Sequence, residues 1–206
     1  MINKIELICQ SALKINSGKI IYFDPFKIDN EYNDADIIFI THSHYDHFSL
    51  EDILKIKKDT TKIIVTSDLE EKCKELGFKD IITVKPNNNY IIDNISFSTV
   101  PAYNIGKDFH KKEYNWVGYV INIDNNILFI AGDTDNIPEI RNINCDIAFV
   151  PVGGTYTMNY IEAVSLIKEM KPKLAIPIHY SLVGSKEAAY NFKKELDGVI
   201  EVKILM

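Results

Sequence analysis

The sequence contains a single arginine, Arg141, and no long hydrophobic run. Its 23 basic residues stand against 29 acidic ones, for a formal net charge of -6 over 206 residues. Because nucleic-acid-binding proteins gain most of their affinity from lysine and arginine on phosphates, this balance disfavours nucleic acid as a partner. Apolar runs such as Ile37–Ile40 span only a few residues, whereas a membrane-spanning helix needs about 20. No membrane partner is therefore expected.

Cysteine is also scarce. Cys9, Cys73 and Cys145 are odd in number, widely spaced and outside any CxxC pattern. This argues against a disulfide framework and suits a reduced compartment. The segment Met1–Glu6 has no apolar stretch of the signal-peptide type. We therefore expect a cytoplasmic location.

No stretch rich in proline, glycine and serine divides the chain, and no internal repeat is present. Hydrophobic residues make up 46% and charged residues 25%, which is the balance of an ordinary globular domain. At this length one domain is expected, covering residues 1–206.

Apolar periodicity predicts an α/β pattern of strands and helices. Helices are expected over residues 50–57, 69–76, 160–170 and 186–196. Strands are expected over residues 4–9, 12–15, 19–23, 36–41, 63–66, 81–84, 90–92, 95–100, 117–123, 127–131, 147–151, 174–178 and 199–205, with a tight turn at Asp124–Asn126. Two sheets with helices on the outside would bury these strands, although periodicity alone does not choose among α/β architectures.

Three of the five histidines fall within six residues, in the string Thr41-His42-Ser43-His44-Tyr45-Asp46-His47. The string directly follows a predicted buried strand, and α/β proteins place ligands where strands end. It supplies three imidazoles and a carboxylate, which zinc and similar divalent ions bind readily. His42 and His44 are two residues apart, so they point the same way on an extended segment. The string therefore predicts a metal site.

Three further residues are candidates by position. Asp133 lies in Gly132-Asp133-Thr134 after a predicted strand, where a turn aspartate is the alternative when the motif stands alone. His179 closes the predicted strand 174–178. His110 lies in a polar loop and is either a ligand or a solvated loop histidine.

These motifs, taken in order, resemble the metallo-β-lactamase superfamily. The ordered signature is THSHYDH, then GDT, then Pro177-Ile178-His179-Tyr180. The stretches 100–104, 150–158 and 171–173 also look like the ascorbate-6-phosphate-lactonase-like branch of small metal-dependent hydrolases. The resemblance covers essentially the whole chain and implies a four-layer αβ/βα sandwich with a metal site at one edge.

The resemblance also implies the ligand sets. One ion would be held by His42, His44 and a third histidine downstream. The other would be held by Asp46, His47 and His179, with Asp133 bridging both. Relatives in this branch often carry the third histidine directly after the Pro-Ala pair, where this chain has Tyr103-Asn104. His110 is then the candidate, with the Asn104 oxygen as an alternative for a harder ion such as manganese.

Other residues are assigned roles around these ligands. Asp24 resembles the branch's Asp-Pro pair and is expected to hydrogen-bond a metal-binding histidine, with an Asp-Pro turn as the alternative. Tyr103, Asn104, Gly154 and Tyr156 are expected to contact the substrate; for Gly154, an ordinary Gly-Gly turn is the alternative.

The sequence thus predicts a hydrolase with one or two zinc ions, or manganese, acting on a small ester, lactone or phosphodiester. Water activated by the ions is the expected nucleophile, with Asp46 and Asp133 orienting it. Two alternatives stay open: a nuclease on the same scaffold, and a metal-binding protein without catalysis. A small molecule is the expected partner. The substrate, the physiological metal and whether the chain forms a homo-oligomer are not determined by the sequence.

Overall fold

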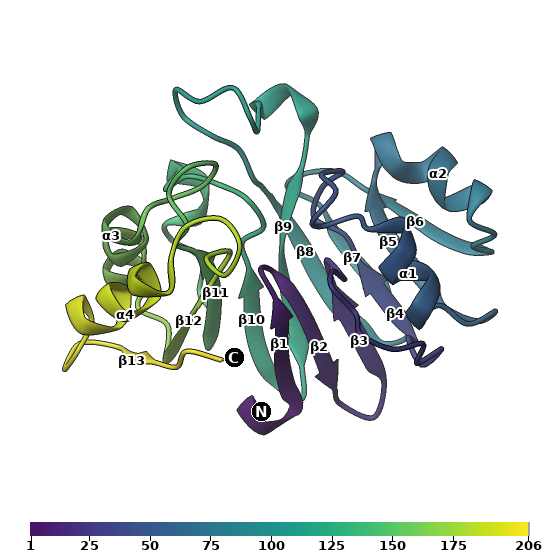
Figure 1. Cartoon of the computed structure of the whole chain (residues 1–206), viewed down its shortest axis with the longest axis horizontal. Helices are drawn as coiled ribbons and strands as arrows, with labels where there is room; N and C mark the ends of the chain where they lie inside the picture. The colour runs from purple at the N-terminus through teal and green to yellow at the C-terminus, as the bar shows by residue number, and fades with distance from the viewer. Residues whose placement is uncertain (206) are drawn as a thin grey trace. The chain divides into compact units, whose positions relative to one another are not determined.

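The computed structural model describes residues 1–205, which fall into two compact units, residues 1–85 and residues 86–205 (Figure 1). Within the described residues each unit contains one β-sheet and two α-helices. No helix in residues 1–205 has the length and apolar character needed to cross a membrane. A single domain over residues 1–206 stays a prediction, and residue 206 lies outside the described residues.

The sheet of the first unit has the order β1-β2-β3-β4-β5-β6. Its strands are β1 (Ile5–Cys9), β2 (Ala12–Asn16), β3 (Ile20–Phe23), β4 (Ile37–Phe39), β5 (Lys62–Thr66) and β6 (Asp80–Val84). The first three strands run antiparallel, and β3 to β6 run parallel. Parallel strands are buried on both faces, which explains the continuous apolar runs of β4 and β5.

Helices α1 (Leu50–Ile56) and α2 (Glu70–Glu75) pack on this sheet. Ser49 caps α1 as predicted, because its side chain accepts a hydrogen bond from the Asp52 N–H. The apolar face of α1 joins residues of β4 and β5 in one buried cluster. That cluster comprises Tyr22, Ile28, Ala35, Ile38, Ile40, Phe48, Ile53, Ile56, Ile63, Val65, Leu69, Cys73 and Phe78.

The sheet of the second unit has the order β13-β12-β11-β10-β9-β8-β7. Its strands are β7 (Asn89–Ile92), β8 (Ile95–Pro101), β9 (Val117–Ile123), β10 (Asn126–Ile130), β11 (Ile147–Pro151), β12 (Leu174–Ile178) and β13 (Glu201–Val202). Strands β7 to β10 are antiparallel, and β10 to β13 are parallel.

Helices α3 (Tyr160–Met170) and α4 (Lys186–Glu195) pack on the parallel part of this sheet (Figure 1). Asn159 and Glu162 form a capping box at the start of α3, and Lys171, with a φ of 55°, ends the helix in a left-handed conformation. Buried residues of α3 and α4, among them Leu166, Ile167 and Phe192, share one cluster with residues of β10 and β11.

The predicted α/β class is confirmed, and the structure corrects some boundaries. The final strand covers only Glu201–Val202 and not residues 199–205, because the N–H groups of Val199 and Ile200 both donate to the carbonyl of Leu196. The hairpin between β9 and β10 has a two-residue turn, Asp124-Asn125, with both φ angles positive. Short 3₁₀ helices that periodicity does not reveal are η1 (Ile2–Lys4), η2 (Ser67–Leu69), η3 (Lys112–Tyr114) and η4 (Pro138–Ile140).

Candidate metal centre

The first unit gathers its candidate side chains where the parallel strands β3 and β4 end. Asp24 directly follows β3, and its N–H donates to the carbonyl of Phe39 at the end of β4 (2.9 Å). The buried Asp24 carboxylate accepts from the N–H of Thr41 at Oδ1 (2.8 Å) and from its hydroxyl at Oδ2 (2.7 Å). Asp24 has a φ of 45°, in the left-handed region that aspartate tolerates better than most residues. This carboxylate ties the two strand ends together.

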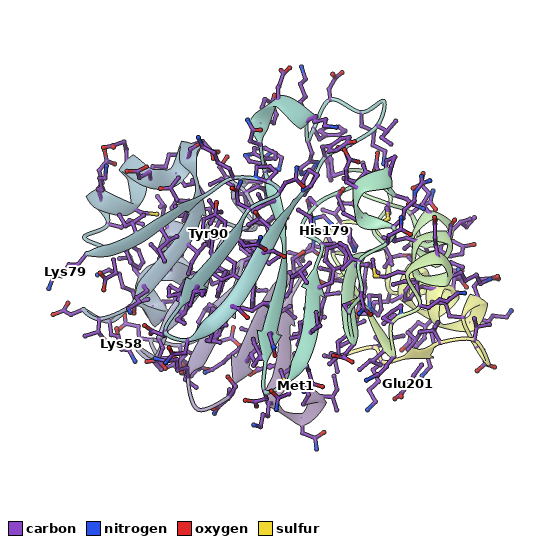
Figure 2. All side chains as sticks on the ribbon, turned by 180° about the vertical axis from the view of Figure 1, so that it is seen from behind. Met1, Lys58, Lys79, Tyr90, His179 and Glu201 are labelled. Atoms are coloured by element: carbon purple, nitrogen blue, oxygen red, sulfur yellow. The ribbon has the colours of Figure 1, made fainter. Side chains whose placement is uncertain are left out.

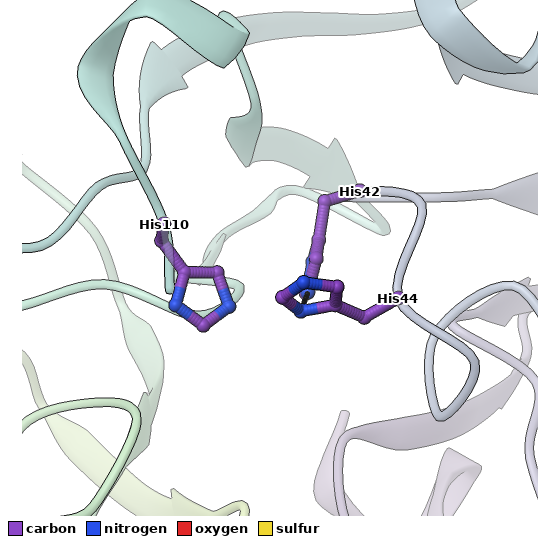
Figure 3. Close-up of side chains that lie close together, drawn as sticks. All are labelled: His42, His44 and His110. Carbon is purple, nitrogen blue, oxygen red and sulfur yellow. Dashed lines mark hydrogen bonds between the residues drawn. The ribbon is translucent and has the colours of Figure 1, made fainter. Parts of the chain in front are cut away.

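His42 and His44 extend from the loop after β4, and their rings come together (Figure 3). The Thr41 hydroxyl has one hydrogen, which it donates to Asp24, so it accepts from His42 Nδ1 (3.0 Å). A neutral His42 therefore carries its lone pair on Nε2, which lies 3.1 Å from His44 Nδ1. Two ligands at 2.0–2.1 Å from one tetrahedral zinc ion are about 3.3 Å apart. The pair thus has the spacing of two nitrogens on one ion.

His47 is fixed in the same way. Its Nδ1 lies 2.8 Å from Asp24 Oδ2, and since a carboxylate only accepts, Nδ1 carries the proton. The Nε2 of a neutral His47 then carries the lone pair, 3.8 Å from Asp46 Oδ2. Carboxylates that hold metal-binding histidines by the other ring nitrogen orient the ring and raise its basicity. Asp24 has this geometry toward His47 directly and toward His42 through Thr41.

In the second unit, two histidines meet one carboxylate oxygen. Asp133 follows β10, and its Oδ2 lies 3.3 Å from His110 Nε2 and 3.1 Å from His179 Nε2. His179 stands at the end of β12 (Figure 2), and the ring of His110 comes from the loop before β9 (Figure 3). All three side chains are buried. The structure therefore brings together three residues that are far apart in the sequence.

Gly153 and Gly184 leave room for the backbone of His179, because a side chain at either position would clash. His179 has a φ of 55°, which costs a non-glycine residue about 1–2 kcal/mol. A Cβ on Gly153, in the loop after β11, would lie 2.2 Å from the carbonyl oxygen of His179. A Cβ on Gly184 would in turn lie 2.7 Å from the Gly153 Cα. This close packing of three backbone segments fixes the position of His179.

Asn104 contacts His110 and Asp135 contacts Asn104, and the sequence did not reveal the three residues as a group. The Asn104 Oδ1 lies 2.9 Å from His110 Nδ1, and Asn104 Nδ2 donates to Asp135 Oδ1 (3.1 Å). The only signal for Asp135 is a second aspartate two positions after Asp133. Thr41 was likewise given no role, although it directly precedes the first histidine.

The residues predicted to contact the substrate make these contacts within the second unit. The Tyr103 hydroxyl donates to the Glu139 carboxylate (3.0 Å); burial, together with this carboxylate, raises the pKa of Tyr103. The Gly154 N–H donates to the carbonyl of Met158 (3.0 Å). The Tyr156 carbonyl accepts from Asn104 Nδ2 (2.9 Å), and its ring meets that of Phe109 edge-on. Their contact with a substrate stays a prediction.

The chemistry of the donors fits a borderline divalent ion. Seven residues each offer an atom able to bind a metal ion, namely His42, His44, Asp46, His47, His110, Asp133 and His179. Imidazole and carboxylate together are the donors that zinc takes, and manganese also accepts them. No cysteine is among these seven residues, and Cys73 and Cys145 are buried in the two hydrophobic clusters. The residues present therefore fit the metal that the sequence predicts.

Comparison with known proteins identifies the family of this chain. The family profile of the β-lactamase superfamily domain matches residues 4–179. A UPF0173 metal-dependent hydrolase from Pyrococcus horikoshii is 30% identical in sequence, over 98% of this chain and 96% of the relative.

Solved structures give the same result. A protein from Parabacteroides distasonis, whose structure was solved as that of a metal-dependent hydrolase, is 30% identical with a TM-score of 0.83, over 98% of this chain and 93% of that one. The metallo-β-lactamase fold protein YhfI from Bacillus subtilis is 16% identical with a TM-score of 0.73, over 95% of this chain and 88% of that one, and shows the fold alone. The superfamily and the fold class that the motifs predict are confirmed.

Proposed function

Because the chain belongs to the metallo-β-lactamase superfamily, we propose that it is a metal-dependent hydrolase of a small ester, lactone or phosphodiester. The observation that carries the proposal is the donor geometry within each unit. His42 Nε2 and His44 Nδ1 are 3.1 Å apart, and Asp133 Oδ2 lies 3.1–3.3 Å from two imidazole nitrogens. These are the separations of ligand atoms that share an ion.

We propose the ligand sets that the resemblance to the superfamily implies. His42, His44 and His110 would hold one ion, in line with the superfamily resemblance. Asp46, His47 and His179 would hold the other, with Asp133 shared between them. The ions are zinc in this proposal, with manganese as the alternative, and occupancy is one or two.

The residues of the chain have distinct tasks. Bound divalent ions supply Lewis acidity and water that ionises near neutral pH. Asp24 and Thr41 hold His42 and His47 as the tautomers that present Nε2. Asp46 and Asp133 would orient a water molecule as the nucleophile, and Asp46 would accept its proton.

A small substrate is favoured over a nucleic acid. The chain carries a net charge of -6 and one arginine, so it lacks the excess of positive charge that phosphate backbones require.

Metal content tests the site directly. Protein freed of metal, loaded with zinc and dialysed is analysed by mass spectrometry for zinc per chain. His44→Ala should lose most of the bound zinc, whereas Ser43→Ala, one position away in the same loop, should keep it. Zinc content in His44→Ala equal to the wild type would reject the metal site.

The second of these ligand sets has its own test. If His47 and His179 hold the same ion, either alanine variant should already lose that ion, and the double variant should lose no more. Additive losses of zinc affinity in the double variant would show that the two donors act on different ions.

Activity separates the three functions. Zinc- and manganese-loaded protein is assayed on 4-nitrophenyl acetate, a γ-lactone and bis(4-nitrophenyl) phosphate, and on single-stranded DNA and RNA. Turnover of a small ester, lactone or diester that is lost in His44→Ala supports the proposal. Cleavage of nucleic acid alone would favour the nuclease, and tight zinc without turnover would favour a binding protein.

A further inference from the structure

We propose that Asn104 and Asp135 are positioning residues that present His110 to the metal. The inference rests on the proposed function, since it takes His110 as a donor. In this role both side chains act through the ring of His110 and not as ligands of the metal.

Hydrogen bonding fixes which way the Asn104 amide faces. Its Nδ2 donates to Asp135 Oδ1 (3.1 Å) and to the carbonyl of Tyr156 (2.9 Å), and both partners can only accept. The amide oxygen must therefore be the atom that lies 2.9 Å from His110 Nδ1. Because that oxygen also only accepts, His110 carries its proton on Nδ1. A neutral His110 then has its lone pair on Nε2, the nitrogen directed at Asp133.

The Asp135 carboxylate is itself held in place. It is 6% exposed and accepts from the N–H of Ile105 (2.7 Å) and from Lys107 Nζ (2.6 Å). Lys107 also donates to the carbonyl of Thr157 (2.8 Å). A buried carboxylate compensated by one cation and two N–H groups has little freedom to turn. Asp135 therefore provides the fixed acceptor that prevents the Asn104 amide from flipping.

Asn104 also holds the backbone of the loop that carries His110. The backbone N–H of Asn104 donates to the carbonyl of His110 (2.7 Å), so this residue hydrogen-bonds both the main chain and the side chain of the histidine. The ring of Trp116 meets the imidazole edge-on, with centroids 5.5 Å apart. A donor on a loop is preorganised only when its rotamer and its ring orientation are both held, and here they are.

Zinc binding to Asn104 variants tests this role, with zinc itself as the probe. Zinc dissociation constants are measured by chelator competition on metal-free protein. Asn104→Ala should weaken zinc binding about 10- to 100-fold, the usual effect of removing such a partner. Asn122→Ala, an exposed asparagine on β9, is the matched control and should leave affinity unchanged.

A reciprocal exchange covers the case in which the alanine variant does not fold. Asn104→Asp alone sets two buried carboxylates against each other and should weaken zinc binding. Adding Asp135→Asn removes the repulsion between the two carboxylates and keeps the charge. It leaves the Tyr156 carbonyl facing an acceptor and Lys107 Nζ facing an NH₂ group, so only part of the lost affinity should return. Loop stability would follow the same pairing, so the tautomer of His110 separates the two explanations.

The tautomer of His110 is the readout that does not depend on metal. Nitrogen-15 chemical shifts of the metal-free wild type should show His110 protonated on Nδ1, and Asn104→Ala should show a mixture of tautomers. A wild type that binds no zinc would reject the proposed function itself. Zinc binding in the wild type with the same affinity in Asn104→Ala, or a wild-type His110 protonated on Nε2, would overturn only the inference about Asn104.

Discussion

Replacing Asp24 with asparagine removes the negative charge of a buried side chain and turns one accepting oxygen into a donating NH₂ group. Asparagine has the same shape and also tolerates the left-handed φ of 45° found at this position. Its oxygen can still accept from the N–H of Thr41 (2.8 Å). An NH₂ group then replaces Oδ2, and it cannot accept from the Thr41 hydroxyl (2.7 Å) or from His47 Nδ1 (2.8 Å). His47 is left to accept at Nδ1 and to carry its proton on Nε2, the atom proposed to bind metal.

The expected size of the effect follows from these contacts. Hydrogen bonds to a charged group contribute about 1.5–3 kcal/mol each, and Asp24→Asn loses two of them. The free energy of unfolding of the metal-free variant should therefore fall by at least about 3 kcal/mol. Loss of a carboxylate that orients a metal-binding histidine typically weakens metal binding about 10- to 100-fold. In free energy this is about 1.4–2.7 kcal/mol.

The assay combines zinc competition with urea unfolding of the metal-free protein. Asp36→Asn is the control, because Asp36 is also held by a backbone N–H, that of Ile20 (2.8 Å), and by Lys58 (2.6 Å), but contacts no candidate donor. It should lower stability and leave zinc affinity intact. Zinc binding in Asp24→Asn as tight as in the wild type would refute the reasoning, and so would an equal loss of affinity in Asp36→Asn.

Three further predictions follow from other parts of the structure. Burial alone would raise the pKa of Asp52, but hydrogen bonds from a serine and from backbone N–H groups lower it below its usual value. The ionised Asp52 carboxylate therefore contributes its full stabilisation of the fold above about pH 4, and this contribution is lost as the pH falls through the lowered pKa. Asp52→Asn should cost about 1–3 kcal/mol at pH 7 and flatten the pH dependence of urea unfolding in acid, and an unchanged profile would contradict this. Burial raises the pKa of Cys73 and of Cys145 to about 12, so about one thiol in 10,000 is ionised at pH 8 and iodoacetamide should modify only Cys9 in the native protein, as counted by mass spectrometry. Gly153→Ala would put a Cβ 2.2 Å from the carbonyl oxygen of His179. It should lower the free energy of unfolding by about 1–3 kcal/mol or more and weaken zinc binding. Wild-type stability and zinc affinity would show that the loop adapts freely.

Local pattern was sufficient for most of the elements. The buried strands β4, β5 and β11 lie within or close to their predicted spans, because an apolar run between turn signals is a property of the nearby sequence alone. The Ser49 cap of α1 is local in the same sense. The predicted span of the final strand, residues 199–205, was wrong because a strand extends only as far as it is paired. Only Glu201 and Val202 pair with β12.

The sequence by itself determined the α/β class, the superfamily and a candidate donor set, since spacing within a motif and the order of motifs are readable along the chain. Only the tertiary structure decided what surrounds each donor. The spacing of these residues does not predict that the Asn104 amide holds Nδ1 of the His110 ring while Nε2 of the same ring faces the Asp133 carboxylate. Those contacts come from a loop closed by hydrogen bonds to Asp135, thirty-one positions from Asn104. Such closure depends on strands β8 and β10 ending at the same edge of one sheet, and local propensity carries no information about that edge.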